Sequence, residues 1–569
     1  RAWLSQVVAL SPAHQGALRW LALHGEAESA DAIIGLLRGT HEPGARFTLL
    51  LRLARARRSA GDWEGAVAAY ELAAESDANA VEPLHHLLSL HMERQHWPLA
   101  IDVLARLSQR APELALRLER TAGVLYLEEL RDPQNAAHCF QRALRADPND
   151  TESREALLAI HRASGDDDAL AATLTDLLSA RADSDAALEL GDLLVGRLGR
   201  YDDAVRVWRH AAASVTDPLP LFERITKAYP RSGKPDAQLM SEHRDVLSVA
   251  VDRPDSHYAL FCAYRRERAY DRAWLHAAAL RVLGDDAKPA RDFVAEHRTH
   301  SMAAVRRPWA DTEWDAVLAR FGGEATWNYI AALGHWLQRV TSRTPADWGL
   351  DPRRDITHPR TLPELAEVIG YGSTALSLPV PALWLSDQHA GVMQSGDAVG
   401  ALVLGPDIVS SKADRATAFR LLRGLALLHP RLRGVACVAH PDSLVALVAA
   451  AQALAHGRAA DAPLVARWLT ALRHEHADVV THLNVATRTF EEAGGSALHA
   501  ETWPTVVEQV ACCVALTLTG SISQSIEGVR NEPAALGVGV LSDRLLDLLR
   551  FWVSDTHVNL RADLGIGVG

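Results

Sequence analysis

The sequence predicts a mainly α-helical chain, with an α-solenoid over residues 1–290 followed by a helix-rich α+β domain over residues 291–569. Three observations support this prediction. A small residue recurs about every 34 residues through the first half, the recurrence fades near residue 290, and the composition then shifts from Ala, Leu and Arg toward Gly, Val and Thr. A fixed period of this length indicates stacked helical repeats.

The recurring position forms a ladder that is mostly alanine. Its members are Ala32, Ala66, Ala100, Ala136, Leu170, Ala204, Gln238 and Ala273. A large or apolar side chain comes four residues later, as in Tyr70, Phe140 and Trp208. A small side chain lets two helices approach closely, and we expect the aromatic ring one turn later to fill the gap to the neighbouring unit. Leu170 is bulkier than the pattern requires and Gln238 is polar, so the later units fit it less well.

Other positions keep the same phase. Pro112 and Pro148 stand twelve residues after their ladder positions, where a proline ends the second helix of a unit. Gly123 and Gly191 each lie thirteen residues before one. With these residues the chain resembles the tetratricopeptide repeat family, whose 34-residue unit is a helix–turn–helix. The resemblance covers roughly residues 15–285 and implies about eight units.

The turns and the start of the chain follow from the same pattern. The segments Ser59–Trp63 and Ser164–Asp167 contain the Gly and Asp residues expected between paired helices. Residues 2–12 resemble the second helix of a unit whose first helix is missing, and Arg1 stands where Met is expected. Because solenoids normally end in a capping repeat, we expect either a truncated first unit or an unusual cap.

Composition narrows the classes of function. The net charge of −12 is spread evenly and leaves no basic stripe, which argues against nucleic-acid binding. Five cysteines without a CxxC pair favour buried free thiols and a reducing, cytoplasmic location. The longest apolar runs, Leu444–Ala451 and Val510–Leu518, are too short to cross a bilayer, so no direct membrane insertion is expected. An arginine-rich, lysine-poor composition with much alanine favours a GC-rich bacterial genome.

Residues 291–569 alternate helical and mixed segments. Asp311–Arg320 and Ala325–Val340 have amphipathic helical patterns, and Pro345–Pro363 has the composition of a loop. Two apolar runs, Ala382–Leu385 and Ala401–Leu404, predict strands of a small sheet near residues 380–405. The rest is predicted to be helical over Ala413–His429, Leu444–His456, Ala462–His474, Val479–Glu491, Thr505–Leu518 and Ser542–Val553.

The strand Ala401–Leu404 and the following helix resemble the corresponding elements of zincin-type metallopeptidases. Such enzymes carry His-Glu-x-x-His on that helix, with two imidazoles that bind zinc and a glutamate that takes a proton from the zinc-bound water. Here the helix contains Arg423-Gly424-Leu425-Ala426-Leu427 instead. The resemblance therefore implies a degenerate fold without metal chemistry, and the sequence assigns no catalytic residue, metal ligand or cofactor.

One alternative is a divergent metallohydrolase in the carboxy-terminal domain. His474-Glu475-His476-Ala477-Asp478 opens like a zincin helix, and His482 lies close by in the sequence. Two histidines and a neighbouring third could bind a metal ion. The other interpretation is a solvated helix end rich in polar side chains.

The leading hypothesis is a non-enzymatic scaffold or assembly subunit that binds protein partners within a larger complex. The repeat resemblance implies a concave surface lined by the first helix of each unit, which holds a peptide or a partner helix. If the inward-facing positions of the family apply here, six residues would contact the partner. They are Arg55, Arg58, His85, Ser89, Glu155 and Arg162. These residues could equally be solvated polar side chains.

Overall fold

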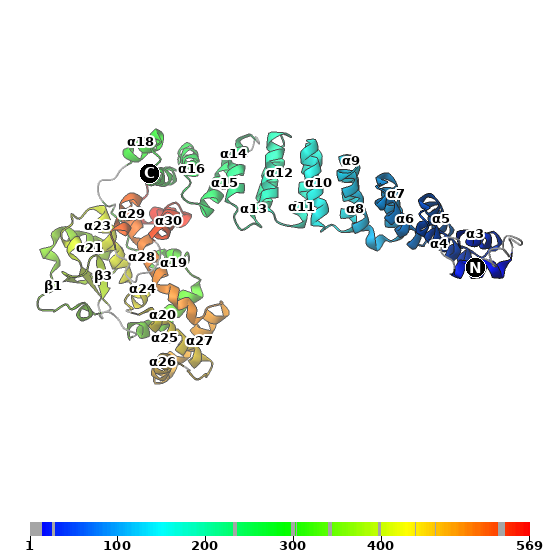
Figure 1. Cartoon of the computed structure of the whole chain (residues 1–569). Coiled ribbons are helices and arrows are strands. Elements are labelled where there is room, and N and C mark those ends of the chain that lie inside the picture. Colours follow the sequence, from blue (N-terminus) through cyan, green and yellow to red (C-terminus); the bar gives the residue numbers. More distant parts are fainter. Residues whose placement is uncertain are drawn as a thin grey trace. The chain divides into compact units, whose positions relative to one another are not determined.

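The computed structural model describes residues 14–24, 29–231, 236–297, 302, 304–339, 344–395, 400–438, 440–460, 462–532 and 541–568 (Figure 1). The helix expected over residues 2–12 lies outside this part of the chain. The molecule is mainly helical and divides into two compact units, Arg1–Ser232 and Gly233–Gly569.

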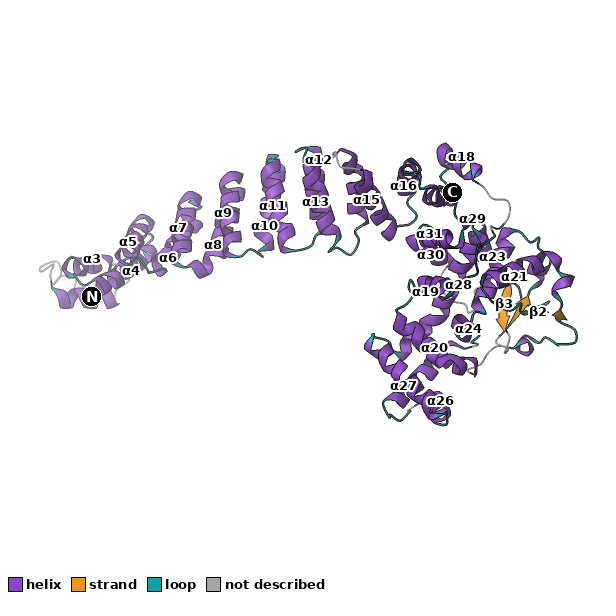
Figure 2. Cartoon of the chain, turned by 180° about the vertical axis from the view of Figure 1, so that it is seen from behind, coloured by secondary structure: helices purple, strands orange, loops and turns teal. Residues whose placement is uncertain are grey.

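The amino-terminal unit is a series of helical hairpins in which each helix packs on the next, so that the hairpins stand in a row (Figure 2). The first helices of the hairpins are α2 (Gln15–His24), α4 (Pro43–Ser59), α6 (Glu82–Glu93), α8 (Ala115–Glu128), α10 (Thr151–Ser164), α12 (Ser184–Gly196) and α14 (Leu219–Ala228). The second helices are α3 (Ser29–Gly39), α5 (Trp63–Ser76), α7 (Trp97–Arg110), α9 (Pro133–Ala146), α11 (Asp167–Ala180) and α13 (Tyr201–Ala212). The predicted solenoid is confirmed over this unit.

The alanine ladder lies at the helix crossings. Ala66, Ala100, Ala136 and Ala204 are fully buried on successive second helices. The expectation that an aromatic ring fills the gap to the neighbouring unit is confirmed for Tyr70, which stacks on His86 of α6 with ring centroids 4.9 Å apart. Trp208 also packs within its own hairpin. A Cβ on Gly191 of α12 would lie 2.0 Å from the ring of Trp208 on α13, so the ring packs on the first helix of its own hairpin. The glycine leaves the space that the ring fills.

The predicted turns also have a local cause. Gly61 and Gly165 have positive φ angles of 79° and 67°, which glycine adopts without steric cost. The side chains of Asp62 and Asp166 accept hydrogen bonds from the backbone N–H of Gly65 and Ala169, at 2.9 and 3.0 Å. Each aspartate therefore starts the second helix of its hairpin as an N-cap.

The 34-residue sequence pattern extends beyond the end of the amino-terminal compact unit. The pattern continues to about residue 290, but the compact units meet between Ser232 and Gly233. Helices α15 (Asp236–Val249), α16 (Pro254–Arg266) and α17 (Tyr270–Val282) share one hydrophobic core with the carboxy-terminal helices. The ladder is out of phase in α15, because Gln238 is exposed and Met240 is buried instead.

The carboxy-terminal unit surrounds the buried helix α28 with shorter helices. After α17 its helices are α18 (Lys288–Glu296), α19 (Asp311–Leu318), α20 (Glu324–Arg339), α21 (Pro363–Ala375), α22 (Pro406–Val409), α23 (Arg415–Leu427), α24 (Pro430–Ala436), α25 (Pro441–Ala455), α26 (Pro463–Arg473), α27 (Ala477–Glu492), α28 (Trp503–Thr519), α29 (Ile522–Arg530), α30 (Leu541–Trp552) and α31 (Asp555–Leu564). The last ladder helix is tied to this group, since Trp552 Nε1 donates a hydrogen bond to the Leu275 carbonyl at 2.8 Å.

The sheet has the order β1-β2-β4-β3. Its strands are β1 (Ile356–Thr357), β2 (Ala382–Leu385), β3 (Val392–Ser395) and β4 (Ala401–Leu404). β2 and β4 pair in parallel with Ala382 opposite Ala401, and the other two pairs are antiparallel. β2 and β4 have the predicted bounds, whereas β3 lies between them and was not predicted. The segment Pro345–Pro363 is irregular, as predicted, apart from short 3₁₀ turns and β1.

Candidate protein-interaction face

The first-helix face of the amino-terminal unit is formed by α4, α6, α8, α10, α12 and α14. Arginine–carboxylate pairs join several successive first helices. On the first two, Arg55 donates a hydrogen bond to Glu82, and Arg58 donates to Glu93 and, at 3.4 Å, to the Ser89 hydroxyl. All six predicted contact residues lie on first helices, and three of them, Arg55, Arg58 and Ser89, connect α4 to α6.

The same arrangement recurs further along the face. Arg162 donates two hydrogen bonds to Glu189 of α12, at 2.7 and 2.6 Å, and these bonds raise the pKa of the guanidinium. Arg224 of α14 donates to Asp192 of α12 at 2.9 Å. Exposed pairs of this kind contribute little to stability one by one. They link neighbouring first helices at the surface of the unit.

The two remaining predicted residues have a different environment. His85 of α6 and Glu155 of α10 are exposed, and neither contacts an opposite charge in the described part of the chain. Both lie fifteen residues before their ladder positions, and Thr121 of α8 occupies the same place and is also exposed. Sequence reasoning missed Thr121, although the ladder phase was sufficient to find it. His85, Thr121 and Glu155 together form an exposed series, one residue on each of three successive first helices.

The carboxy-terminal unit contains a buried charge cluster instead of a zincin site. Arg423 of α23, at the position where the zincin motif would begin, is fully buried and donates to Glu508 at 2.9 Å and to Glu532 at 3.3 Å. Burial by itself would lower the pKa of Arg423, but the two glutamates raise it above its usual range. Arg420 also donates to Glu532 and to Asp407. The cluster thus joins α22, α23, α28 and the end of α29.

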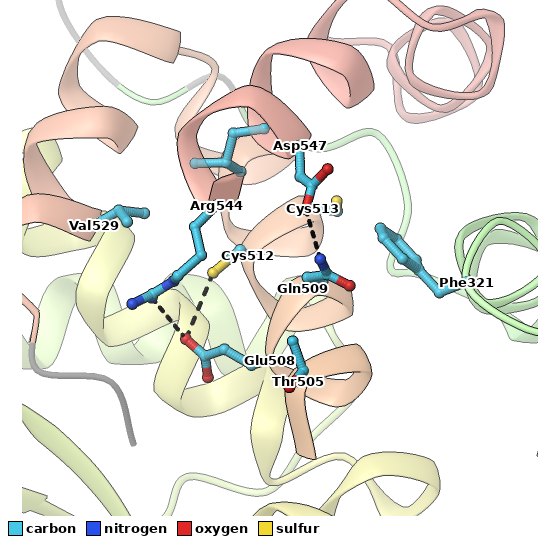
Figure 3. Close-up of a pocket in the computed structure, with 10 residues that line it drawn as sticks. Phe321, Thr505, Glu508, Gln509, Cys512, Cys513, Val529, Arg544 and Asp547 are labelled. Atoms are coloured by element: carbon cyan, nitrogen blue, oxygen red, sulfur yellow. Dashed lines mark hydrogen bonds and ion pairs between the residues drawn. The ribbon is translucent and has the colours of Figure 1, made fainter. Parts of the chain in front are cut away.

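A small cavity lies beside this cluster, between α28 and α30 (Figure 3). Arg544 donates to Glu508 at 3.2 Å, and Gln509 donates to Asp547 at 2.6 Å. Burial raises the pKa of Glu508, but Arg423, Arg544 and the Cys512 thiol together lower it below its usual value. Burial raises the pKa of the neighbouring Cys512 thiol to about 12, so the thiol is protonated and a poor nucleophile. The charged groups here hold one another and stabilise the packing of the helices.

The histidines of the metallohydrolase alternative do not converge. His474 follows α26, His476 precedes α27 and His482 lies within α27, and all three are exposed. Among the described residues, no three His, Cys, Asp or Glu side chains are placed to hold one metal ion. None of the five cysteines forms a disulfide; Cys262 is half-buried and the other four are buried.

Comparisons with known proteins give one family match. Residues 48–80, which cover most of α4 and all of α5, match the tetratricopeptide repeat model. This match supports the repeat resemblance over that stretch. No curated protein matches the chain. None of the described helices combines the length and apolar character needed to cross a bilayer.

Solved tetratricopeptide repeat structures align with part of the chain. A tetratricopeptide repeat protein from Parabacteroides merdae is 14% identical, with 51% of this chain and 97% of that one covered and a TM-score of 0.20. YrrB, described as a protein of this kind with an unusual peptide-binding site, is 18% identical over 35% and 94%, with a TM-score of 0.19. A thermophilic repeat protein from Thermus thermophilus is 20% identical over 32% and 98%, with a TM-score of 0.16.

Proposed function

We propose that the chain is a non-enzymatic interaction scaffold whose protein partner lies on the first-helix face. The observation that supports this proposal is the exposed series His85, Thr121 and Glu155 on three successive first helices. Stacked helical hairpins present extended surfaces of this type to peptides and partner helices.

The chemistry of the face favours a partner of mixed charge. The exposed series offers an imidazole, a hydroxyl and a carboxylate, and the flanking arginines Arg55, Arg58 and Arg162 are already paired with glutamates of the next helix. The paired arginines therefore connect the helices, and the exposed series supplies the contacts. A face whose helices are linked in this way loses less conformational entropy when it binds a partner.

Site-specific photocrosslinking in the native cells tests this proposal. A photoreactive amino acid at His85, Thr121 or Glu155 should give one crosslinked adduct of the same mass from all three positions. The matched control is Leu72 of α5, which is exposed on a second helix and should not give this adduct. Equal adducts from Leu72, or a chain that stays uncrosslinked and monomeric by native mass at all three positions, would contradict the proposal.

A further inference from the structure

A groove lies between the second helices α11 and α13 of the amino-terminal unit. Its volume is about 760 Å³. Leu190 and Leu194 of α12, both buried beneath the surface, form the floor. Small or apolar side chains, among them Ala171, Ala172 and Val207, contribute to the walls. The groove is therefore apolar at its base and open to solvent above.

A side-chain clamp that joins two other second helices of the unit is missing at this hairpin. Between α5 and α7, Arg106 donates two hydrogen bonds to Glu71, at 2.9 and 2.8 Å, and so clamps two neighbouring second helices together. Glu71 lies five residues after its ladder position and Arg106 six residues after the next one. The corresponding residues of α11 and α13 are Thr175 and His210, and both line the groove. The Thr175 hydroxyl donates to the carbonyl of Ala171 in its own helix, at 2.7 Å, so the clamp is absent.

The charged rim of the groove favours an anionic ligand. Its lining includes three arginines and two aspartates. Arg200 and Arg206 both donate to Asp203, which lowers the pKa of that carboxyl and leaves one positive charge in excess on the α13 wall. The side chain of Arg206 is 74% exposed. In a chain of net charge −12, this wall is locally positive.

The dimensions match a short peptide. Asp168 and Ser179 line the groove near the two ends of α11, and eleven helical steps between them span about 16 Å. An extended peptide covers that length with about five residues. Apolar side chains of such a peptide would cover Leu190 and Leu194, and an acidic side chain would meet Arg200 and Arg206.

We propose that the groove between α11 and α13 binds a short segment of a partner protein that carries apolar residues followed or preceded by Asp or Glu. This site is separate from the first-helix face and does not depend on the function proposed above. A partner that uses both would gain affinity from linked binding.

A peptide selection against a closed groove tests the proposal. Random twelve-residue peptides displayed on phage are selected on the purified full chain, and enriched sequences are synthesised and titrated by fluorescence anisotropy. The double variant Thr175→Glu and His210→Arg introduces into α11 and α13 the residue pair that clamps α5 to α7. It should bind the enriched peptides at least tenfold more weakly. Because a restored clamp should leave the melting temperature unchanged or higher, weaker binding would not reflect unfolding.

Two further variants test the charge preference of the groove and distinguish it from the first-helix face. Arg206→Gln should weaken binding of the acidic peptides several-fold, whereas the pair His85→Ala and Glu155→Ala should leave it unchanged. The proposal would be overturned if nothing were enriched, if the enriched peptides were basic, or if the closed variant bound them as well as the parent chain. Loss of binding in the His85 and Glu155 variant would assign the peptides to the first-helix face instead.

Discussion

At the scale of single residues, the glycines of the first helices decide how closely a hairpin packs. Gly191 lies under the ring of Trp208, which is itself fully buried. We predict that Gly191→Ala destabilises the amino-terminal unit by about 1–3 kcal/mol, because the added methyl group overpacks a rigid aromatic contact. Urea unfolding followed by circular dichroism measures this change.

Gly196 provides the matched control in the same helix. A Cβ at Gly196 would meet no atom within 4 Å, so Gly196→Ala should be neutral or should stabilise by up to about 1 kcal/mol through helix propensity. If the two alanine variants unfolded at the same urea concentration, the ring of Trp208 would not occupy the space beside Gly191.

The residues of the proposed interaction face could be only partly predicted from the sequence. The repeat period placed Arg55, Arg58, His85, Ser89, Glu155 and Arg162 on first helices, and the structure has all six there. The period contains no information about which of them pair across a hairpin boundary, since pairing depends on side chains 27 to 35 residues apart. The clamp positions Glu71, Arg106, Thr175 and His210 keep a fixed phase, but Ala105 and Gln141 stand at the first clamp position of other units, so the phase alone does not locate the groove.

At the scale of elements, the buried arginine of α23 holds several segments of the carboxy-terminal unit together. Arg423 is fully buried and lies between Glu508 of α28 and Glu532 after α29. We predict that Arg423→Leu costs about 3–5 kcal/mol of the unfolding free energy, because it leaves buried carboxylates without their partner. Chemical denaturation of the full chain, monitored by tryptophan fluorescence, reports the loss.

Arg431 of α24 is the matched control, because its substitution removes an arginine that pairs with exposed carboxylates instead of buried ones. It bonds Asp311 at 2.8 Å and also Asp315, but both aspartates are largely exposed. Arg431→Leu should therefore cost only about 0–1 kcal/mol. Equal losses in the two arginine variants would show that the α23 cluster is not a special buried site.

Elements with a strong local signal were predictable, and elements defined by tertiary packing were not. β2 and β4 are short continuous apolar runs, and their bounds agree with the prediction. β3 has the sequence Val-Met-Gln-Ser, and its polar second half does not match the apolar pattern of a buried strand. It is buried because it pairs with β4 and because Gly424 lets α23 approach it closely. The helix α21 was not predicted; the segment assigned to a loop ends at Pro363, which is the first residue of the helix, where proline is favourable.

At the scale of the whole molecule, the carboxy-terminal unit buries several histidines in the neutral state. Burial lowers the pKa of His257 and His429 to about 4 and that of His557 to about 3. His257 contacts His276 through their Nδ1 atoms at 2.9 Å, and the second imidazole is also close to Arg244 and Arg272. His257 Nε2–H donates to the Val251 carbonyl at 2.7 Å, so Nδ1 of the neutral His257 accepts the hydrogen bond from His276 Nδ1–H. Protonation of that acceptor nitrogen would bring two N–H groups together and is disfavoured.

These histidines predict a loss of stability in mild acid. Below pH 6.5 the unfolded chain binds protons that the folded chain excludes until about pH 4, so the stabilisation is complete above pH 6.5 and falls as the pH decreases through this window. Each histidine contributes a slope of up to about 1.4 kcal/mol per pH unit. Carboxyls with a lowered pKa, such as Glu313 at about 2, begin to contribute only below about pH 4.5.

Urea titrations between pH 7.5 and 5 should show this slope of the unfolding free energy against pH. The variant His429→Phe keeps a ring against Trp314 and should reduce the slope by the contribution of one histidine. An unchanged slope in that variant would mean that His429 is not buried as the neutral imidazole.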